Sequence, residues 1–312
     1  MVDMATGADD PEIDLVQRYL YREDPDGSRV ATVIRETLDQ LYDGQRTGRW
    51  RYESLHKTEK THMGTLVEIN LHREFNFDDG LKLDYRIAGI EVDCKFSMSP
   101  YSWMLPPESI NHICLGLWAD DSVSAWSAGL FRVDERFMRR PNRDGKRSLS
   151  KEGHSYVRPL WGGRGELAEN LLLHLPVGVV ERIFSAKART GNQHGQARVN
   201  ELFRSVQGRI VRRAVLATVA QQDDFMKRAR SNGGARTKLQ PEGILVLGHQ
   251  DNDPDVAEAL GLPRPTKGEF ISTRVVPAPT GDPRPQAVIN GLAWVIANPN
   301  DPVVPAPLIP RS

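Results

Sequence analysis

Two short runs of alternating apolar and polar residues, 81–87 and 90–96, constrain the fold of this chain more than any other feature. Alternation of this kind is typical of β-strands, in which successive side chains point to opposite faces of the sheet. The dipeptide Ala88-Gly89 between the runs is short enough for a tight turn, and glycine tolerates the positive φ that such a turn needs. The sequence therefore predicts an antiparallel hairpin.

Polar side chains of both predicted strands should meet on one face of this hairpin. In the first run the apolar residues fall at odd positions, which leaves Asp84 on the opposite face. In the second run Glu91, Asp93 and Lys95 are the polar residues, and the apolar residues between them point inward. Asp84 and Asp93 are therefore expected to reach one point in space, with the Lys95 ammonium beside them.

This acid, acid, lysine cluster has the chemistry of a Mg²⁺-dependent phosphodiesterase site. Mg²⁺ is a hard cation that takes few carboxylates and several waters, which leaves room for a phosphate oxygen. The ion acidifies a bound water, and an ammonium such as Lys95 can orient that water and offset charge on the pentavalent transition state. The pattern predicts metal-assisted hydrolysis of a phosphodiester.

An exposed ion-pair cluster is the alternative interpretation, because acid-x-Lys is a weak pattern. A second example, Asp144-Gly145-Lys146, has a turn composition with no apolar strand beneath it and is predicted to be a solvated loop. A helix predicted over 65–72 favours the catalytic interpretation, because a helix on the hairpin could lend Glu68 as a further carboxylate. Alone, Glu68 is more often an ordinary surface residue of a helix.

Longer runs of this sequence resemble type IIE restriction endonucleases of the NaeI family, within the PD-(D/E)xK nuclease superfamily. The runs that carry the resemblance lie between about residues 26 and 253, at 37–50, 57–62, 67–75, 92–99, 195–204 and 221–228. The resemblance implies a nuclease domain with Asp84, Asp93 and Lys95 as the catalytic set, and with Glu68 as the accessory acid. It also implies Mg²⁺ bound by the two aspartates and the Cys94 backbone carbonyl, with Glu68 as an optional ligand.

The same resemblance implies a type II restriction endonuclease that cuts double-stranded DNA at GCCGGC, leaving blunt ends with 5'-phosphates. A palindromic target calls for two active sites related by a two-fold axis, so a homodimer is the expected assembly. The run Leu41-Tyr42-Asp43-Gly44 resembles the K-x-D-G adenylation motif of DNA ligases, but leucine replaces the nucleophilic lysine. Without that amine no adenylate bond can form, so we expect no ligase activity.

The length of 312 residues exceeds what one hydrophobic core usually covers, which favours two domains. A glycine-rich stretch at 161–165 marks the expected boundary. We therefore expect an endonuclease domain over 1–160, a linker over 161–170 and an effector DNA-binding domain over 171–312. The last domain ends in a Pro-rich tail that is expected to be mobile.

Short helices and a turn in the second domain fit a helix-turn-helix. Helices are predicted over 166–173, 178–186 and 193–206, with a turn at Thr190-Gly191-Asn192. The resemblance implies a winged-helix domain of catabolite-activator type here, which holds a second copy of the DNA site and activates cleavage. Arg suits guanine, and Asn or Gln suits adenine, in the major groove. The candidates for DNA contacts are Gln193, Gln196, Arg198, Asn200 and Arg204. For most of them, a role in core packing or solubility is an equally good explanation.

The charge of the chain is unevenly distributed, although its formal net charge is zero. Residues 1–50 hold 11 acidic against 6 basic residues, whereas residues 181–240 hold 13 basic against 4 acidic residues. A second basic run spans 132–147. Basic regions attract phosphates and make binding salt-dependent, although a solvated helical face is the alternative for the larger region.

Further strands complete the prediction of an α/β chain of the α+β type, with a mixed-sheet nuclease domain. They are predicted over 111–119 and 125–133 in the first domain and over 243–247, 270–276 and 287–296 in the second. The main alternative function is a non-catalytic, sequence-specific DNA-binding regulator on a nuclease scaffold. The presence of both aspartates and the lysine disfavours it, and a protein-interaction module leaves the basic region unexplained.

Neither the cysteines nor the histidines point to another site. Cys94 and Cys114 fall in apolar runs and are expected to be buried thiols rather than a disulfide or metal pair. For His56, His62 and His72, a structural hydrogen bond is a more common role than a contact with phosphate or water. No apolar stretch approaches the length of a membrane span, and the first residues are acidic, so a cytoplasmic location is expected.

Overall fold

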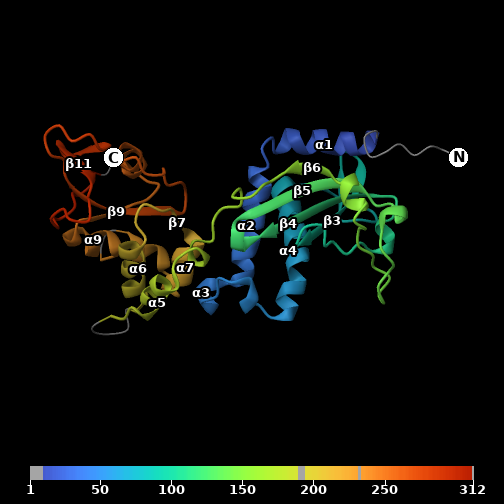
Figure 1. The fold of residues 1–312 in the computed structure, drawn as a ribbon, viewed down its shortest axis with the longest axis horizontal. Coiled ribbons are helices and arrows are strands. Elements are labelled where there is room, and N and C mark those ends of the chain that lie inside the picture. Colours follow the sequence, from blue (N-terminus) through green and yellow to red (C-terminus); the bar gives the residue numbers. More distant parts are fainter. Residues whose placement is uncertain (1–9, 189–193, 231–232, 311–312) are drawn as a thin grey trace. The chain divides into compact units, whose positions relative to one another are not determined.

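The computed structural model describes residues 10–188, 194–230 and 233–310, which separate into two compact units. The first unit contains the described residues up to 42 together with 51–170, and the second contains 43–50 and the described residues from 171 onward. Each unit has its own β-sheet and helices (Figure 1). The chain is thus a mixed α/β protein.

The sheet of the first unit has six strands in the order β1-β2-β3-β4-β5-β6. These are β1 (Asp78–Asp79), β2 (Tyr85–Ile87), β3 (Ile90–Ser97), β4 (Ile113–Asp120), β5 (Ala125–Arg132) and β6 (Arg158–Trp161). Strands β3 and β4 run parallel, whereas the other neighbouring pairs run antiparallel. The predicted mixed sheet is confirmed, and the strands predicted over 111–119 and 125–133 are β4 and β5.

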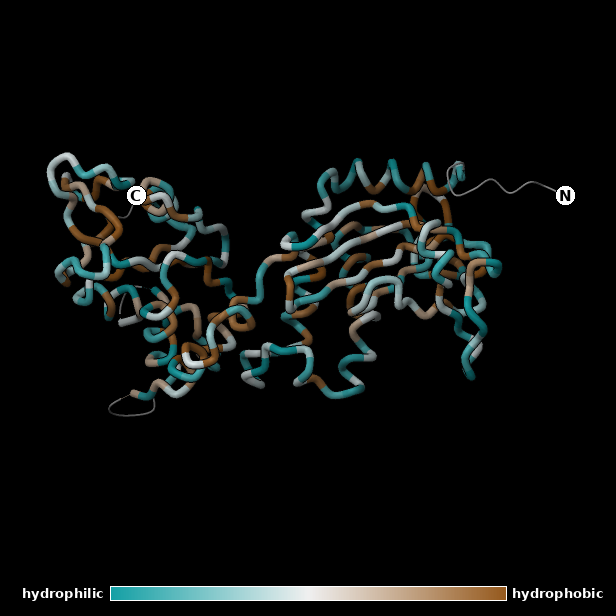
Figure 2. Tube along the Cα trace, in the orientation of Figure 1, coloured by the Kyte–Doolittle hydropathy of each residue, from teal (hydrophilic) through white to brown (hydrophobic). Residues whose placement is uncertain are grey.

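Helices pack on this sheet and form its main core. They are α1 (Pro11–Glu23), α2 (Ser28–Tyr42) and α4 (Lys57–Phe75), and the predicted helix around Glu68 is therefore confirmed as part of α4. Helix α4 packs against α2 and β3, and α1 packs against β5. In Figure 2 the turns of α1 alternate between brown and teal, as expected for a helix that buries Ile13, Val16 and Leu20 on one side.

The central strand β4 is apolar on both faces. Ile113, Leu115 and Leu117 belong to the main core, whereas Cys114 belongs to a smaller core on the other face with Trp103. A Cβ atom at Gly116 would lie 2.7 Å from the Trp103 ring, so only glycine admits this close approach. Because both faces of β4 are buried against a core, its sequence is a continuous apolar run.

The predicted hairpin is present, but its first strand is shorter than expected. Ala88 and Gly89 form the turn with φ values of 52° and 81°. Strand β2 begins only at Tyr85, and Leu81 is 86% exposed rather than turned inward. The backbone N–H groups of residues 81–83 instead donate to the Glu91 carboxylate at 2.8–3.0 Å. The chain therefore curls around Glu91, which the alternation alone does not predict.

The second unit has an antiparallel sheet with the order β10-β11-β9-β7, in which β8 also pairs with β9. The strands are β7 (Val211–Arg212), β8 (Ile244–Leu247), β9 (Glu269–Pro277), β10 (Gln286–Ile289) and β11 (Leu292–Ile296). The strands predicted over 243–247 and 270–276 are confirmed. The run 287–296 is a hairpin of β10 and β11 that turns at Asn290-Gly291.

The described part of the second unit contains six helices besides the short α3. They are α5 (Val177–Ser185), α6 (His194–Ser205), α7 (Arg213–Ala220), α8 (Phe225–Ala229), α9 (Ala235–Leu239) and α10 (Asp253–Ala259). Of these, α6, α7, α9 and α10 contact the strands of the unit. The helices predicted over 178–186 and 193–206 correspond to α5 and α6, and the turn predicted at 190–192 lies outside the described residues. The helix predicted over 166–173 is wrong, because only Leu171–Leu173 form a 3-10 turn there.

Residues 43–50 belong to the second unit although the chain on both sides belongs to the first. This segment contains α3 (Gly44–Thr47), which packs against α7. A Cβ atom at Gly44 would lie 2.0 Å from Thr218 Oγ1, and the Trp50 ring stacks on Phe184 with centroids 4.8 Å apart. The chain therefore passes between the units three times.

Residues 161–170 are the expected linker. They pack in the first unit, and Leu167 belongs to its core.

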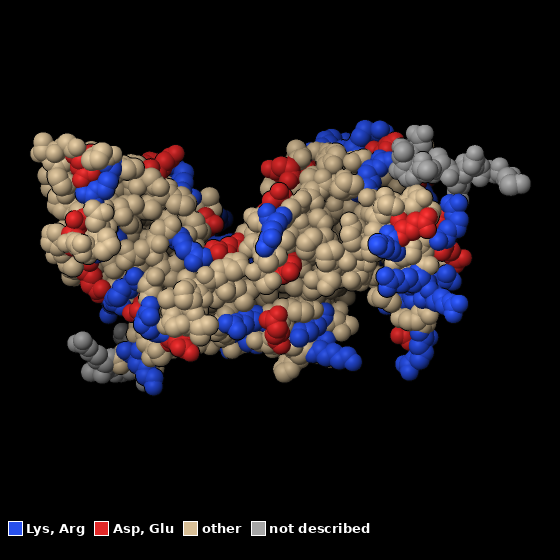
Figure 3. Space-filling model, viewed as in Figure 1, with Lys and Arg blue, Asp and Glu red and all other residues tan. Residues whose placement is uncertain are grey.

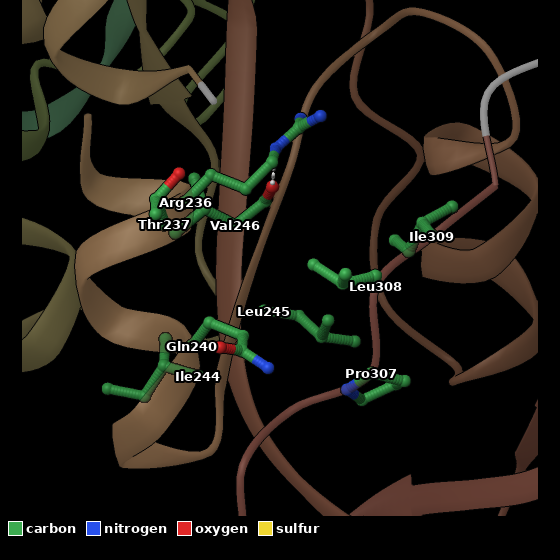
Figure 4. A pocket seen from close by; sticks show the side chains of 9 residues that line it. All are labelled: Arg236, Thr237, Gln240, Ile244, Leu245, Val246, Pro307, Leu308 and Ile309. Atoms are coloured by element: carbon green, nitrogen blue, oxygen red, sulfur yellow. Dashed lines mark hydrogen bonds between the residues drawn. The ribbon is translucent and has the colours of Figure 1, made fainter. Parts of the chain in front are cut away.

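The Pro-rich C-terminal segment contacts the second unit over its described residues, which end at 310, and its mobility stays a prediction. The Ala306 N–H donates to the Gln240 carbonyl at 2.8 Å, and the Gln240 side-chain amide donates back to the Ala306 carbonyl at 2.8 Å. Between this segment, α9 and β8 lies a pocket of about 300 Å³ (Figure 4). Its wall is mainly apolar, and the Arg236 Nε at its rim donates to the Val246 carbonyl at 2.9 Å.

None of the helices within the described ranges combines the length and the apolar character that crossing a lipid bilayer requires. Both cysteines are free and buried, as predicted.

Candidate active site

The structure brings Asp84, Asp93 and Lys95 together at the hairpin of β2 and β3. Lys95 Nζ donates to Asp93 Oδ1 at 2.5 Å, to Asp84 Oδ2 at 3.4 Å and to the Cys94 carbonyl at 2.8 Å. The Cys94 N–H donates to Asp84 Oδ2 at 2.7 Å, which fixes the first carboxylate against the second strand. The predicted meeting of the two acids and the lysine is therefore present in the folded chain.

Burial sets the electrostatics of this cluster. The Asp93 side chain is 3% exposed, and burial, with the Asp84 carboxylate, raises the pKa of Asp93 despite the opposing effect of Lys95. Burial alone would lower the pKa of Lys95, but the Asp93 carboxylate outweighs it and raises that pKa. The ammonium is thus held in its charged form.

One oxygen of the cluster is left without a partner. Asp93 Oδ2 is buried and has no hydrogen bond within the described structure. A buried carboxylate oxygen in this state is costly, and a cation or a bound water removes that cost. Asp93 is therefore arranged to accept a further ligand.

The oxygen atoms around Lys95 fit a hard divalent cation. Two carboxylates and one backbone carbonyl are the ligand types that Mg²⁺ takes, and a single ammonium nitrogen contacts all three groups. Within the described ranges, no three His, Cys, Asp or Glu side chains are grouped as a ready-made metal site. An ion here would complete its shell with water and phosphate, as Mg²⁺ usually does.

Glu68 approaches the cluster from α4. Burial, followed by the Asp84 charge, raises the pKa of Glu68, which places the two carboxylates within electrostatic range of each other. The Tyr85 hydroxyl donates to the Glu68 backbone carbonyl at 2.7 Å and so fastens α4 to β2 beside the cluster. The His72 ring lies edge-on to Tyr85, and its Nε2 lies 2.8 Å from the Phe77 carbonyl, which is a structural role.

The other two histidines have no contact with the cluster in the described structure. His56 is the residue that precedes α4, and its N–H donates to the Glu59 carboxylate at 2.7 Å. His62 is exposed on the same helix.

The candidate DNA contacts on α6 are engaged within the second unit. Gln196 is buried, and its amide donates to Asn200 Oδ1 at 2.8 Å and to the Arg228 carbonyl at 2.9 Å. Helix α6 packs against α5, α7, α8, α9 and β9, so its polar residues face neighbours on several sides. Gln193 lies outside the described residues.

Two arginines of α6 also have internal partners. Arg198 donates to the carbonyls of Val219 and Ala220 at 2.6 and 2.8 Å, at the C-terminal end of α7. Arg204 pairs with Glu242 at 2.7 Å and with a second glutamate on its own helix. The structure does not bring the α6 candidates together on a free face, and their contacts with DNA stay a prediction.

A second buried charged cluster lies in the first unit, which the sequence patterns do not indicate. Asp121 accepts a short hydrogen bond from Arg35 on one oxygen. On its other oxygen it accepts from the Tyr42 hydroxyl and the Asn170 amide, each at 2.8 Å. Arg35 also pairs with Asp39 at 2.8 Å. Arg35, Asp39 and Tyr42 share α2, but Asp121 and Asn170 lie far from them in the sequence, so spacing alone could not have found the whole cluster.

Two acids and a lysine at a hairpin of a mixed sheet have the chemistry that metal-dependent phosphodiesterases use. Residues 14–305 match the family described as restriction endonuclease NaeI. The chain is 63% identical over 302 residues to the type II restriction enzyme NaeI of Lentzea aerocolonigenes, which covers 97% of this chain and 95% of that relative. The chain therefore belongs to the NaeI restriction endonuclease family, and its enzyme class is that of a type II site-specific deoxyribonuclease.

Proposed function

We propose that this restriction endonuclease hydrolyses DNA at the cluster of Asp84, Asp93 and Lys95, with Mg²⁺ as its cofactor. The observation that carries the proposal is the convergence of both carboxylates and the Cys94 carbonyl on one cationic nitrogen. The unpartnered Asp93 Oδ2 supports it, because that oxygen calls for a further ligand.

Each residue has a distinct role in this proposal. Mg²⁺, when bound, polarises the phosphodiester and acidifies a water. Asp84, Asp93 and the Cys94 carbonyl would hold the ion, and Glu68 would supply a further carboxylate for it or for its water. The Lys95 ammonium offsets the charge that develops on the phosphoryl group.

The proposed substrate is double-stranded DNA carrying GCCGGC, cut at its centre to blunt ends with 5'-phosphates. The resemblance described above supports this target, and the palindrome supports a homodimer with two sites related by a two-fold axis. Differences from the relative at base-contacting positions would change the target but not the chemistry.

The second unit is proposed to bind another copy of the DNA site and so to activate cleavage. Its exposed cations support this, because they attract phosphates and none of them has an ion-pair partner among the described residues. They are Arg182, Lys187, Arg213, Lys227, Arg230 and Lys238. A helix-turn-helix that includes α5 and α6 remains part of the proposal.

The test is cleavage of plasmids with one and with two GCCGGC sites, in Mg²⁺ and in EDTA. The natural chain is compared with Asp93→Ala and with Glu36→Ala, which removes an exposed carboxylate from α2. We expect Mg²⁺-dependent cutting at GCCGGC, faster on two sites, lost in Asp93→Ala and kept in Glu36→Ala. Cutting at another sequence would reject GCCGGC as the target but keep the proposed chemistry. Full activity of Asp93→Ala would reject the proposed active site.

A further inference from the structure

Residues 138–149 fold back on themselves as an arm of the first unit. Met138 pairs with Leu149, and the Arg139 N–H donates to the Ser148 carbonyl at 2.8 Å. At the tip, Asn142 Oδ1 accepts from the backbone N–H groups of Asp144 and Lys146 at 3.0 and 2.9 Å. The solvated loop predicted around Asp144 is confirmed as an exposed turn at the end of a hairpin.

The base of this arm is fixed to the body of the unit. Leu105 and Arg147 exchange two backbone hydrogen bonds of 2.8 and 2.9 Å. Leu105 and Leu149 are buried in the smaller core with Trp103 and Phe131. The arm thus holds its side chains in a defined position before any partner binds, which reduces the entropy lost on binding.

The arm presents positive charge that is not neutralised. Residues 139–148 include five basic residues and one acidic residue, and no aliphatic or aromatic side chain apart from proline. Arg147 pairs with Glu135, and Arg143 lies 3.8 Å from Asp144. The remaining basic residues, Arg139, Arg140 and Lys146, are exposed and have no ion-pair partner in the described part of the chain. Figure 3 shows Lys and Arg side chains gathered at the edge of the first unit that carries the arm.

The sheet register places the base of the arm near the candidate active site. Asp93 pairs with Cys114 on β4, which pairs with Phe131 on β5. Neighbouring strands are roughly 5 Å apart, so the Cα atoms of Asp93 and Phe131 are about 10 Å apart. The chain leaves β5 directly after this level, at Arg132, and enters the arm at Met138.

We propose that this arm binds backbone phosphates of the substrate duplex beside the cleaved bond, through Arg139, Arg140 and Lys146. The inference rests on the proposed active site, because the arm is located relative to Asp93. A duplex carries about one charge per 1.7 Å of its axis, so a scissile phosphate at Asp93 brings further phosphates near the arm. The lack of apolar side chains disfavours a protein partner, since interface cores are apolar.

Phosphate contacts position a duplex without reading its sequence. The arm should therefore set the affinity for DNA and its salt dependence, and it should leave the recognition sequence unchanged. The Asn142 turn and the buried leucines hold the arm independently of its exposed arginines, so neutral variants at those positions are expected to fold.

The test is the salt dependence of binding to a GCCGGC duplex by the full chain in EDTA. Arg139→Gln/Arg140→Gln is compared with Arg18→Gln/Arg22→Gln, which removes two exposed arginines from α1. The slope of log K against log salt should fall by about 0.9 for each lost phosphate contact, hence by nearly two in the arm variant. The α1 variant should keep the slope of the natural chain.

Cleavage in Mg²⁺ supplies a second measurement. We expect the arm variant to raise KM at moderate salt, to keep kcat, and to cut the same sequence. An unchanged slope with intact cleavage would reject the arm's role alone, as would a fall in kcat with unchanged KM. Absence of Mg²⁺-dependent cleavage by the natural chain would instead reject the proposed function.

Discussion

Two buried clusters of charged side chains in the first unit differ in how completely their carboxylate oxygens are used. At Asp121, Arg35 contacts one oxygen and two neutral donors contact the other. At Asp93, Lys95 contacts one oxygen and the other has no partner. Lys95 is 23% exposed, whereas the side chains of Arg35 and Asp121 are at most 4% exposed.

This difference separates a structural cluster from a ligand-binding one. Burial of charge is common to both and does not by itself mark a site. A carboxylate whose two oxygens both accept hydrogen bonds stabilises one conformation, whereas a carboxylate with one unsatisfied oxygen is stabilised further when a ligand reaches that oxygen. We therefore expect substitutions at Asp93 to act on catalysis and substitutions at Asp121 to act on stability.

The largest effect is expected for Asp93→Ala. Cleavage in Mg²⁺ should fall by at least about 1000-fold, which corresponds to roughly 4 kcal/mol of transition-state stabilisation. The unfolding free energy at neutral pH should not decrease. The folded pKa of Asp93 is raised, so the stability that its carboxyl contributes is present at acidic pH and is lost as the pH rises through that pKa. Cleavage rates and urea unfolding measure both quantities, and a large loss of stability would contradict the comparison.

Asp121→Ala is expected to show the opposite behaviour. It leaves the Arg35 guanidinium buried without its main partner, which should lower the unfolding free energy by about 3–5 kcal/mol. The rate per folded molecule should stay close to that of the natural chain. Urea unfolding checks the first statement, and the double variant Arg35→Met/Asp121→Leu should recover much of the loss. A fully stable Asp121→Ala would refute the structural role.

Glu68→Gln should have an intermediate effect on catalysis. It keeps the shape of the side chain but removes the charge near Asp84, which should reduce cleavage by about 10–100-fold and raise the Mg²⁺ concentration needed for half-maximal rate. Mg²⁺ titrations of the cleavage rate measure this shift. Glu36→Gln on α2 is the matched control, and an equal shift in that variant would remove Glu68 from the site.

The smallest effect is expected for Tyr42→Phe. It removes one of the two hydrogen bonds to the same oxygen of Asp121 and should lower the unfolding free energy by about 1 kcal/mol. Because Asn170 shares that oxygen, Tyr42→Phe and Asn170→Ala should not be additive in the double variant. Urea unfolding of the four proteins in this cycle measures the coupling, and strict additivity would mean that the two donors act independently.

Local rules in the sequence predict the hairpin and the meeting of its acids with Lys95. Alternation gives the shared face of Asp93 and Lys95 on β3, and Ala88-Gly89 gives the turn. Asp84 lies one residue before β2 and is held in place by the Cys94 N–H instead. The curl of residues 81–83 does not follow, because it depends on a Glu91 side chain that lies beyond the turn. Contacts between distant residues, such as those around Asp121, leave no periodic pattern.

The second unit shows the limit of helical periodicity. The apolar stripe of α6 correctly predicts a helix, but it does not show that polar residues on the other faces are also covered. Gln196 and Arg198 satisfy backbone carbonyls of neighbouring segments, so their polarity reflects buried hydrogen bonding. The residues 43–50 carry no sign in the sequence that they belong to a unit that resumes more than 100 residues later.

That early segment has a consequence for how the protein can be taken apart and how it is made. A fragment that starts at 171 lacks Trp50 and α3, so it exposes the faces of Phe184 and α7 that they cover. During synthesis, residues 43–50 leave the ribosome well before their partners on α5 and α7. Their contacts cannot be complete until the chain has grown past residue 220, which makes the second unit the last to be completed.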